Sequence, residues 1–102
     1  MAKIVTKEEA VKYLSDAPPE QSFWVNNGPV LKNLHELSDF FPQINSETYS
    51  HHVNADKNDF SKWVNDIIGD KKLANELLSS KNKDSMVKKV SARVAMLKKK
   101  SN

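Results

Sequence analysis

The fold is decided by residues 56–70, which read DKNDFSKWVNDIIGD. The apolar side chains in this stretch recur at intervals of three and four residues: Phe60, Trp63, Val64, Ile67 and Ile68. That spacing places them on one face of an α-helix, so the segment is predicted to be a core helix. Asp56 is expected to cap its N-terminus, and Gly69 suits the left-handed conformation that follows many helix ends.

Two further helices are predicted upstream from their start signals. Thr6 and Glu9 fit a capping box, in which the two side chains bond reciprocally to the backbone, at the start of a helix over about residues 7–15. Asn33 and Glu36 give the same signal for a second helix, which a proline then ends.

A short β-hairpin is predicted near residues 23–31. Residues 23–25 and 29–31 read as strands joined by Asn26-Asn27-Gly28, because Asn-Gly tolerates the positive φ angles of a tight turn. Strands this short are not stable alone, so the hairpin must lie on the helices.

Downstream, Ser46 opens a short helix, Asp70 caps another, and Asp84 caps a last helix over about residues 84–98, with residues 99–102 frayed. The fold class is therefore mainly α, a compact bundle of five to six short helices with one hairpin, in a single domain spanning residues 1–102. The predicted core consists of Leu14, Leu34, Leu37, Phe41, Phe60, Trp63, Val64, Ile67, Leu73, Leu77, Val90, Val94 and Leu97.

Size and composition limit the class of protein. A chain of 102 residues with 38% hydrophobic content supports one modest core. It has no cysteine, which excludes disulfides and thiolate chemistry. Without a signal peptide or an apolar run of about 18 residues, we expect a soluble cytoplasmic protein with no membrane partner.

The stretch from Phe23 to Leu78 resembles an uncharacterised family of small helical domains found mainly in archaea. The likeness is carried by the pattern G-P-V-L-K-x-L-x-E-L over residues 28–37, then H-V-N at 52–54, N-D-F-x-x-W at 58–63 and G-D-x-x-L-A at 69–74. The resemblance implies a helical domain and no established activity.

Charge is distributed unevenly along the chain. Residues 81–102 hold eight basic side chains and one acidic side chain, a net charge of +7, whereas residues 1–80 carry −4. In the last helix, the side chains expected within one arc of about 100° are apolar: Met86, Val87, Val90, Val94 and Leu97. The opposite side is expected to be a cationic strip: Lys88, Lys89, Arg93, Lys99 and Lys100.

The cationic strip leads to the main functional hypothesis, a non-enzymatic protein that contacts nucleic-acid phosphates through those five side chains. Lysine holds phosphate as a point charge without reading bases, so binding should be largely independent of sequence. An acidic protein or an anionic membrane surface is an alternative partner, and insertion into a membrane is the weakest of these because the apolar side of the helix is needed by the core. A further alternative is that the strip is only a solvated face.

The hairpin gives a second hypothesis. Phe23 and Trp24 could form a protein-interaction surface, because aromatic side chains are enriched at interface centres. The alternative is that Trp24 plugs the edge of the helical core.

Catalytic and metal-binding signatures are not found. His51 and His52 are adjacent and diverge on a helix, His35 is distant, and no zinc-ligand spacing occurs. The chain lacks a nucleophile elbow and a glycine-rich phosphate loop. We expect no enzyme activity, cofactor, metal or small-molecule substrate, and a structural role for His52, hydrogen-bonded to a carboxylate or to backbone at the start of the Phe60 helix.

Overall fold

The computed structural model describes residues 4–80 and 82–102, so Lys81, one of the basic residues counted above, lies outside the described part. Its α-helices are α1 (Lys7–Leu14), α2 (Leu34–Phe40), α3 (Ser46–His52), α4 (Asp59–Trp63), α5 (Lys71–Ser79) and α6 (Lys83–Ser101). Short 3₁₀ turns cover Pro19–Gln21 and Phe41–Gln43. Strands β1 (Phe23–Trp24) and β2 (Val30–Leu31) form an antiparallel hairpin. The predicted mainly α bundle with one short hairpin is confirmed.

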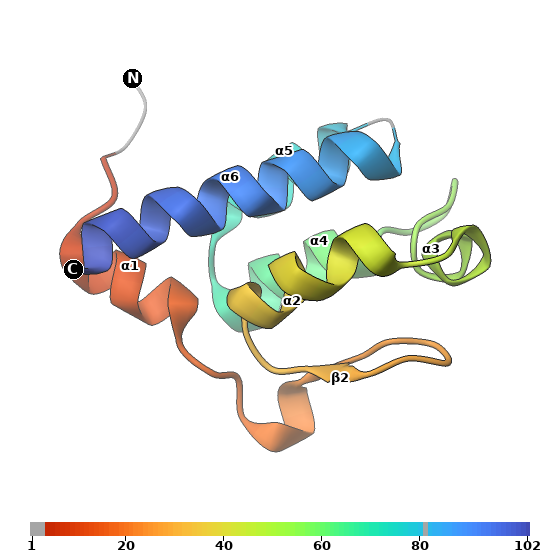
Figure 1. Ribbon diagram of the computed structural model, residues 1–102, viewed down its shortest axis with the longest axis horizontal. Coiled ribbons are helices and arrows are strands. Elements are labelled where there is room, and N and C mark those ends of the chain that lie inside the picture. The colour runs from red at the N-terminus through yellow and green to blue at the C-terminus, as the bar shows by residue number, and fades with distance from the viewer. Residues whose placement is uncertain (1–3, 81) are drawn as a thin grey trace.

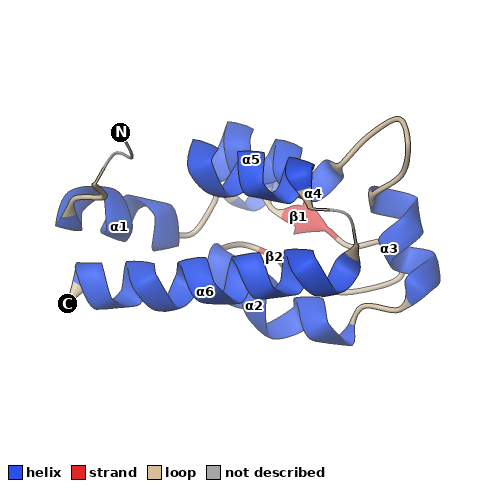
Figure 2. Cartoon of the chain, turned by 90° about the horizontal axis from the view of Figure 1, so that it is seen from above, coloured by secondary structure: helices blue, strands red, loops and turns tan. Residues whose placement is uncertain are grey.

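The long helix α6 organises the arrangement of the elements. It runs along one edge of the molecule, the hairpin runs along the opposite edge, and α2 and α4 lie between them (Figure 1). α6 packs against α1, α2 and α5. Both views place α1 beside the C-terminal half of α6 (Figures 1 and 2). The two edges are therefore separated by the core.

Phe60 stands at the centre of the core, with its side chain fully buried. The ring of Phe23 stacks on it at 4.7 Å between centroids, and the ring of Phe41 lies 4.8 Å away on a tilt. Trp63 meets Phe23 edge-on and donates its indole N–H to the Gln21 carbonyl at 2.8 Å. The hairpin is thus held on the helices by aromatic packing, as its length requires.

The predicted core is buried except for Leu14 and Ile67, which are only partly buried. The structure adds residues that the prediction omitted, Phe23, Val25 and Ile44 among them.

Ile67 is displaced because the helix that begins at Asp59 does not stay α-helical. Val64–Ile68 form one π-helical turn, and the amide of Gly69 bonds to the Val64 carbonyl at 2.8 Å. A π-helical turn closes over one more residue than an α-helical turn. The inward position therefore passes from Ile67 to Ile68, which is buried.

Several helix ends follow the sequence signals. Thr6 and Glu9 form the predicted capping box. Asp70 caps α5 by accepting from the amide of Leu73 at 3.2 Å, and Gly69 adopts the left-handed region with φ 89°. Each of these signals is local, so it needs no tertiary context.

Two predicted caps are wrong. α4 is capped by Asn58 and α6 by Asn82, each accepting from a backbone amide three residues on. Asp56 instead lies in the turn that precedes α4, where the backbones of Asn54 and Lys57 bond to each other. Asn caps a helix as well as Asp does, so in each case the cap is the Asn that directly precedes the first helical residue.

α6 also extends beyond the predicted range of 84–98. It continues to Ser101, so residues 99–101 are helical and not frayed. Leu97 is fully buried, and α1 lies along this half of the helix (Figure 1). Packing against α1 keeps the last turn of α6 helical, whereas helix propensity alone would let it fray.

The two tryptophans give a matched stability test, because Trp63 is 7% exposed and Trp24 is 72% exposed. Trp63→Ala should lower the free energy of unfolding by about 3 to 5 kcal/mol, since it removes a large core side chain. Trp24→Ala should change it by less than about 0.5 kcal/mol. Denaturant unfolding of both variants measures this, and equal losses would contradict the packing described here.

Candidate functional site

Arg93, predicted on the exposed cationic strip, is buried, and that expectation is wrong. Its side chain is 7% exposed, with Nε 2.7 Å from Oδ2 of Asp70 and a terminal guanidinium nitrogen 2.8 Å from Oδ1. Asp70 is itself 1% exposed. The guanidinium is therefore neutralised inside the protein and cannot reach a phosphate.

The lysines of α6 remain at the surface except Lys83, which is half-buried and donates its Nζ to the Ile44 carbonyl at 2.8 Å. Those that are exposed and form no ion pair with any described residue are Lys88, Lys98, Lys99 and Lys100. Lys89 is also exposed, but its Nζ lies 3.8 Å from Oε2 of Glu76 on α5. A contact at this length between partly exposed groups is weak, so Lys89 keeps most of its availability.

Lys88 and Lys99 point in nearly the same direction from α6. They are eleven residues apart, which is close to three helical turns and ~16 Å along the axis. The exposed side chains between them include Ala92 and Ala95, which are short. The two lysines therefore extend from one face of α6, and that face carries short side chains between them.

The structure separates the two residues proposed for the hairpin surface. Phe23 is buried against Phe60, so its predicted place at an interface is wrong. Trp24 is 72% exposed and pairs across the hairpin with Val30, which is 43% exposed. Successive side chains of a strand point to opposite faces, so burying Phe23 forces Trp24 outward. The interpretation of Trp24 as a plug at the core edge is wrong.

His52 has the structural role that was predicted. Its Nε2 accepts the backbone N–H of Asn26 at 3.0 Å, so Nδ1 carries the ring proton and donates it to Oδ2 of Asp59 at 2.9 Å. The ring also packs against Phe23 and Phe60. One side chain thus joins the hairpin, α3 and the start of α4.

The carboxylate of Asp59 is stabilised in its charged form. Burial alone would raise the pKa of Asp59, but hydrogen bonds from His52 and Lys57, together with the charge of Lys57, hold the pKa below its ordinary value.

The histidines do not come together around a metal site. His35 pairs with Asp39 on the exposed side of α2, at 3.1 Å. The rings of His51 and His52 meet edge-on, 4.9 Å apart. In residues 4–80 and 82–102, no three His, Cys, Asp or Glu side chains are placed to share an ion.

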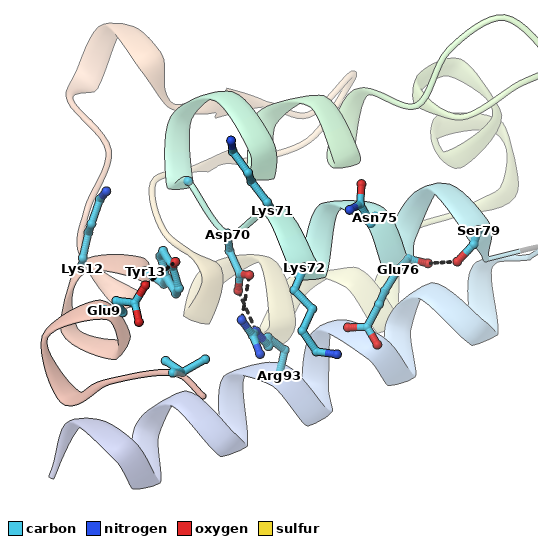
Figure 3. Close-up of a pocket in the computed structure, with 12 residues that line it drawn as sticks. Glu9, Lys12, Tyr13, Asp70, Lys71, Lys72, Asn75, Glu76, Ser79 and Arg93 are labelled. Atoms are coloured by element: carbon cyan, nitrogen blue, oxygen red, sulfur yellow. Dashed lines mark hydrogen bonds and ion pairs between the residues drawn. The ribbon is translucent and has the colours of Figure 1, made fainter. Parts of the chain in front are cut away.

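A hollow of about 800 Å³ lies between α1, α5 and α6, and sequence reasoning did not identify it (Figure 3). Lys12, Lys71 and Lys72 line its walls, and Asp70 and Arg93 are among its lining residues. Lys71 and Lys72 directly follow the predicted cap Asp70, so the sequence alone places two lysines at the start of α5. The approach of Lys12 depends on tertiary packing.

Comparisons of the chain with family models, with curated proteins and with solved structures gave no match. The resemblance to small archaeal helical domains stays a prediction. Among the described residues, every helix is too short or too polar to cross a bilayer.

The buried ion pair can be tested with Asp70→Asn, which keeps a capping oxygen for α5 but removes the charge opposite Arg93. Leaving that guanidinium buried and unpaired should cost about 3 to 5 kcal/mol of unfolding free energy. Asp66→Asn, at an exposed position, should cost less than about 0.5 kcal/mol.

A double-mutant cycle separates the charge pair from the packing of the two side chains. Asp70→Asn with Arg93→Met should be less destabilising than the two single losses added together. Additive losses measured by urea denaturation would show that the two charges do not interact.

Acid should weaken the junction around Asp59. Because the folded pKa of Asp59 lies below its ordinary value of 3.8, its contribution to stability is complete above that value and is lost as pH falls through the folded pKa. Urea midpoints measured between about pH 6 and pH 2 should therefore fall less steeply in Asp59→Asn than in the parent. Identical acid profiles would contradict this assignment.

Proposed function

We propose that this protein is a non-enzymatic binding protein that contacts the phosphate backbone of nucleic acid through α6. The observation that carries the proposal is the exposed face of α6, where the uncompensated ammonium groups are those of Lys88, Lys98, Lys99 and Lys100. Lys89 adds to this face from its edge. Lysines in such an arrangement displace counterions from a polyanion, which favours binding at low salt.

The burial of Arg93 supports binding that does not depend on base sequence. Arg93 is the only arginine among the 102 residues. Its guanidinium is the one side chain here that could read guanine through a bidentate fork, and it is engaged with Asp70. The remaining cationic surface consists of lysines, which contact phosphate as point charges.

The salt dependence of binding tests this proposal. Lys88→Gln/Lys99→Gln removes two phosphate contacts, so the slope of log K against log salt should become shallower by about two for duplex DNA. Lys32→Gln/Lys62→Gln makes the same change in net charge at exposed positions outside α6 and should leave the slope unaltered. Fluorescence anisotropy with a labelled duplex over a salt series measures both.

Three results would count against the proposal. One is the absence of binding by the parent protein at low salt. Another is equal loss of binding in the two double variants, which would indicate attraction by net charge alone. The third is a strong preference for one duplex sequence at equal salt, because lysines on a helix face do not supply it.

A second candidate function is recognition of a protein through the outer face of the hairpin. The observation that favours it is the exposure of Trp24 beside Val30 on a hairpin that is otherwise anchored in the core. Aromatic side chains presented on a fixed backbone are frequent anchors of interfaces.

The two candidates predict different binding behaviour. A complex made through the hairpin should lose at least about tenfold in affinity in Trp24→Ala, the cost typical of an anchor residue, and should change little with salt. A complex made through α6 should show the opposite pattern. For any partner found, a salt series with Trp24→Ala and Lys88→Gln/Lys99→Gln assigns the surface.

A further inference from the structure

We propose that the hollow between α1, α5 and α6 binds a small, multiply charged phosphate compound through Lys12, Lys71 and Lys72. This site goes beyond the proposed contact with nucleic acid, because its walls come from α1 and α5 and not from the exposed face of α6. Its volume of about 800 Å³ lies within the range of sites that hold small molecules.

The acidic side chains that line the hollow already have partners. Asp70 is held by Arg93 at 2.7 and 2.8 Å. Glu76 lies 3.8 Å from Lys89, and Glu9 accepts the backbone N–H of Thr6 at 3.1 Å. The charge of Asp70 is therefore offset by Arg93, that of Glu76 is offset only weakly, and Glu9 is hydrogen-bonded but keeps its charge.

The lysines of the hollow do not have such partners. Lys12, Lys71 and Lys72 form no ion pair with any described residue. With Arg93 they make four basic lining residues against three acidic ones, so the hollow carries a net charge of +1, and its three lysines are the groups without an ionic partner. Ammonium groups without an ionic partner on the walls of one hollow attract an anion.

The lysines approach the hollow from different elements. Lys12 crosses from α1 to Gly69, where a Cβ built on the glycine would lie 3.8 Å from its Nζ. Figure 3 shows Lys12 and Lys71 extending in the same direction from two sides of the hollow, while Lys72 reaches toward α6. The Lys12 side chain therefore lies beside the start of α5, at ordinary contact distance from position 69.

The number of charges decides the class of ligand. A single carboxylate has only two acceptor oxygens and one charge, too few for three ammonium groups that come from different elements. A diphosphate group carries several negative charges and offers many acceptor oxygens within a short span, which matches lysines that act as separate point charges. The diphosphate could be free or part of a nucleotide, and the chemistry of recognition is the same.

The test uses the full chain, ¹⁵N-labelled, with inorganic pyrophosphate added at constant ionic strength. Pyrophosphate should shift the amide signals of Gly69, Lys71 and Lys72 in a saturable way. Lys12→Gln and Lys71→Gln should each weaken the affinity by about three- to tenfold. Lys62→Gln, an exposed lysine on α4 that lies outside the hollow, should leave the affinity unchanged.

The outcomes are distinct. Shifts confined to the C-terminal turns of α6, equal weakening by Lys62→Gln, or the same shifts with sulfate at the same concentration would overturn the proposal. A second titration with ADP identifies the source of the diphosphate. Tighter binding than pyrophosphate indicates a nucleotide, and equal binding indicates the diphosphate group alone, both at the proposed site.

Discussion

The buried pair of Asp70 and Arg93 is the interaction on which the rest of the structure depends. The carboxylate of Asp70 caps α5 at the amide of Leu73 and binds the guanidinium of Arg93 with both oxygens. Burying two charges is costly, so the pair is not in itself a source of large net stability. Its effect is positional, because a bidentate contact between a helix cap and one residue of α6 fixes where α5 begins on that helix.

This pair also determines which charges of α6 remain exposed. With Arg93 inside, the charge of α6 that reaches solvent is carried by lysines, and lysines attract phosphate without discriminating bases. The same pair lies at the hollow between α1 and α5 and neutralises the carboxylate that would otherwise offset Lys71 and Lys72. One internal contact therefore removes a guanidinium from one surface and offsets a carboxylate at the edge of the other.

The sequence predicted those features that depend on local chemistry. The capping box at Thr6, the left-handed Gly69 and the apolar period from Phe60 to Val64 need only neighbouring residues, and the structure confirms each. The sequence did not predict the burial of Arg93, because Arg93 lies at the margin of the apolar arc of α6. A side chain at that position is buried only where another element supplies a carboxylate, as Asp70 does here. The meeting of Lys12 with Gly69 is likewise tertiary.

The two candidate surfaces can act independently because the core holds each in place separately. Trp24 faces outward since Phe23 is stacked on Phe60 and His52 holds the amide of Asn26, so its exposure is set by packing and not by a loose turn. The α6 face lies on the opposite edge of the molecule (Figure 1). Substitutions at sites this far apart, without shared partners, have additive effects. A polyanion bound at α6 would therefore leave the hairpin free to bind a protein, and the reverse also holds.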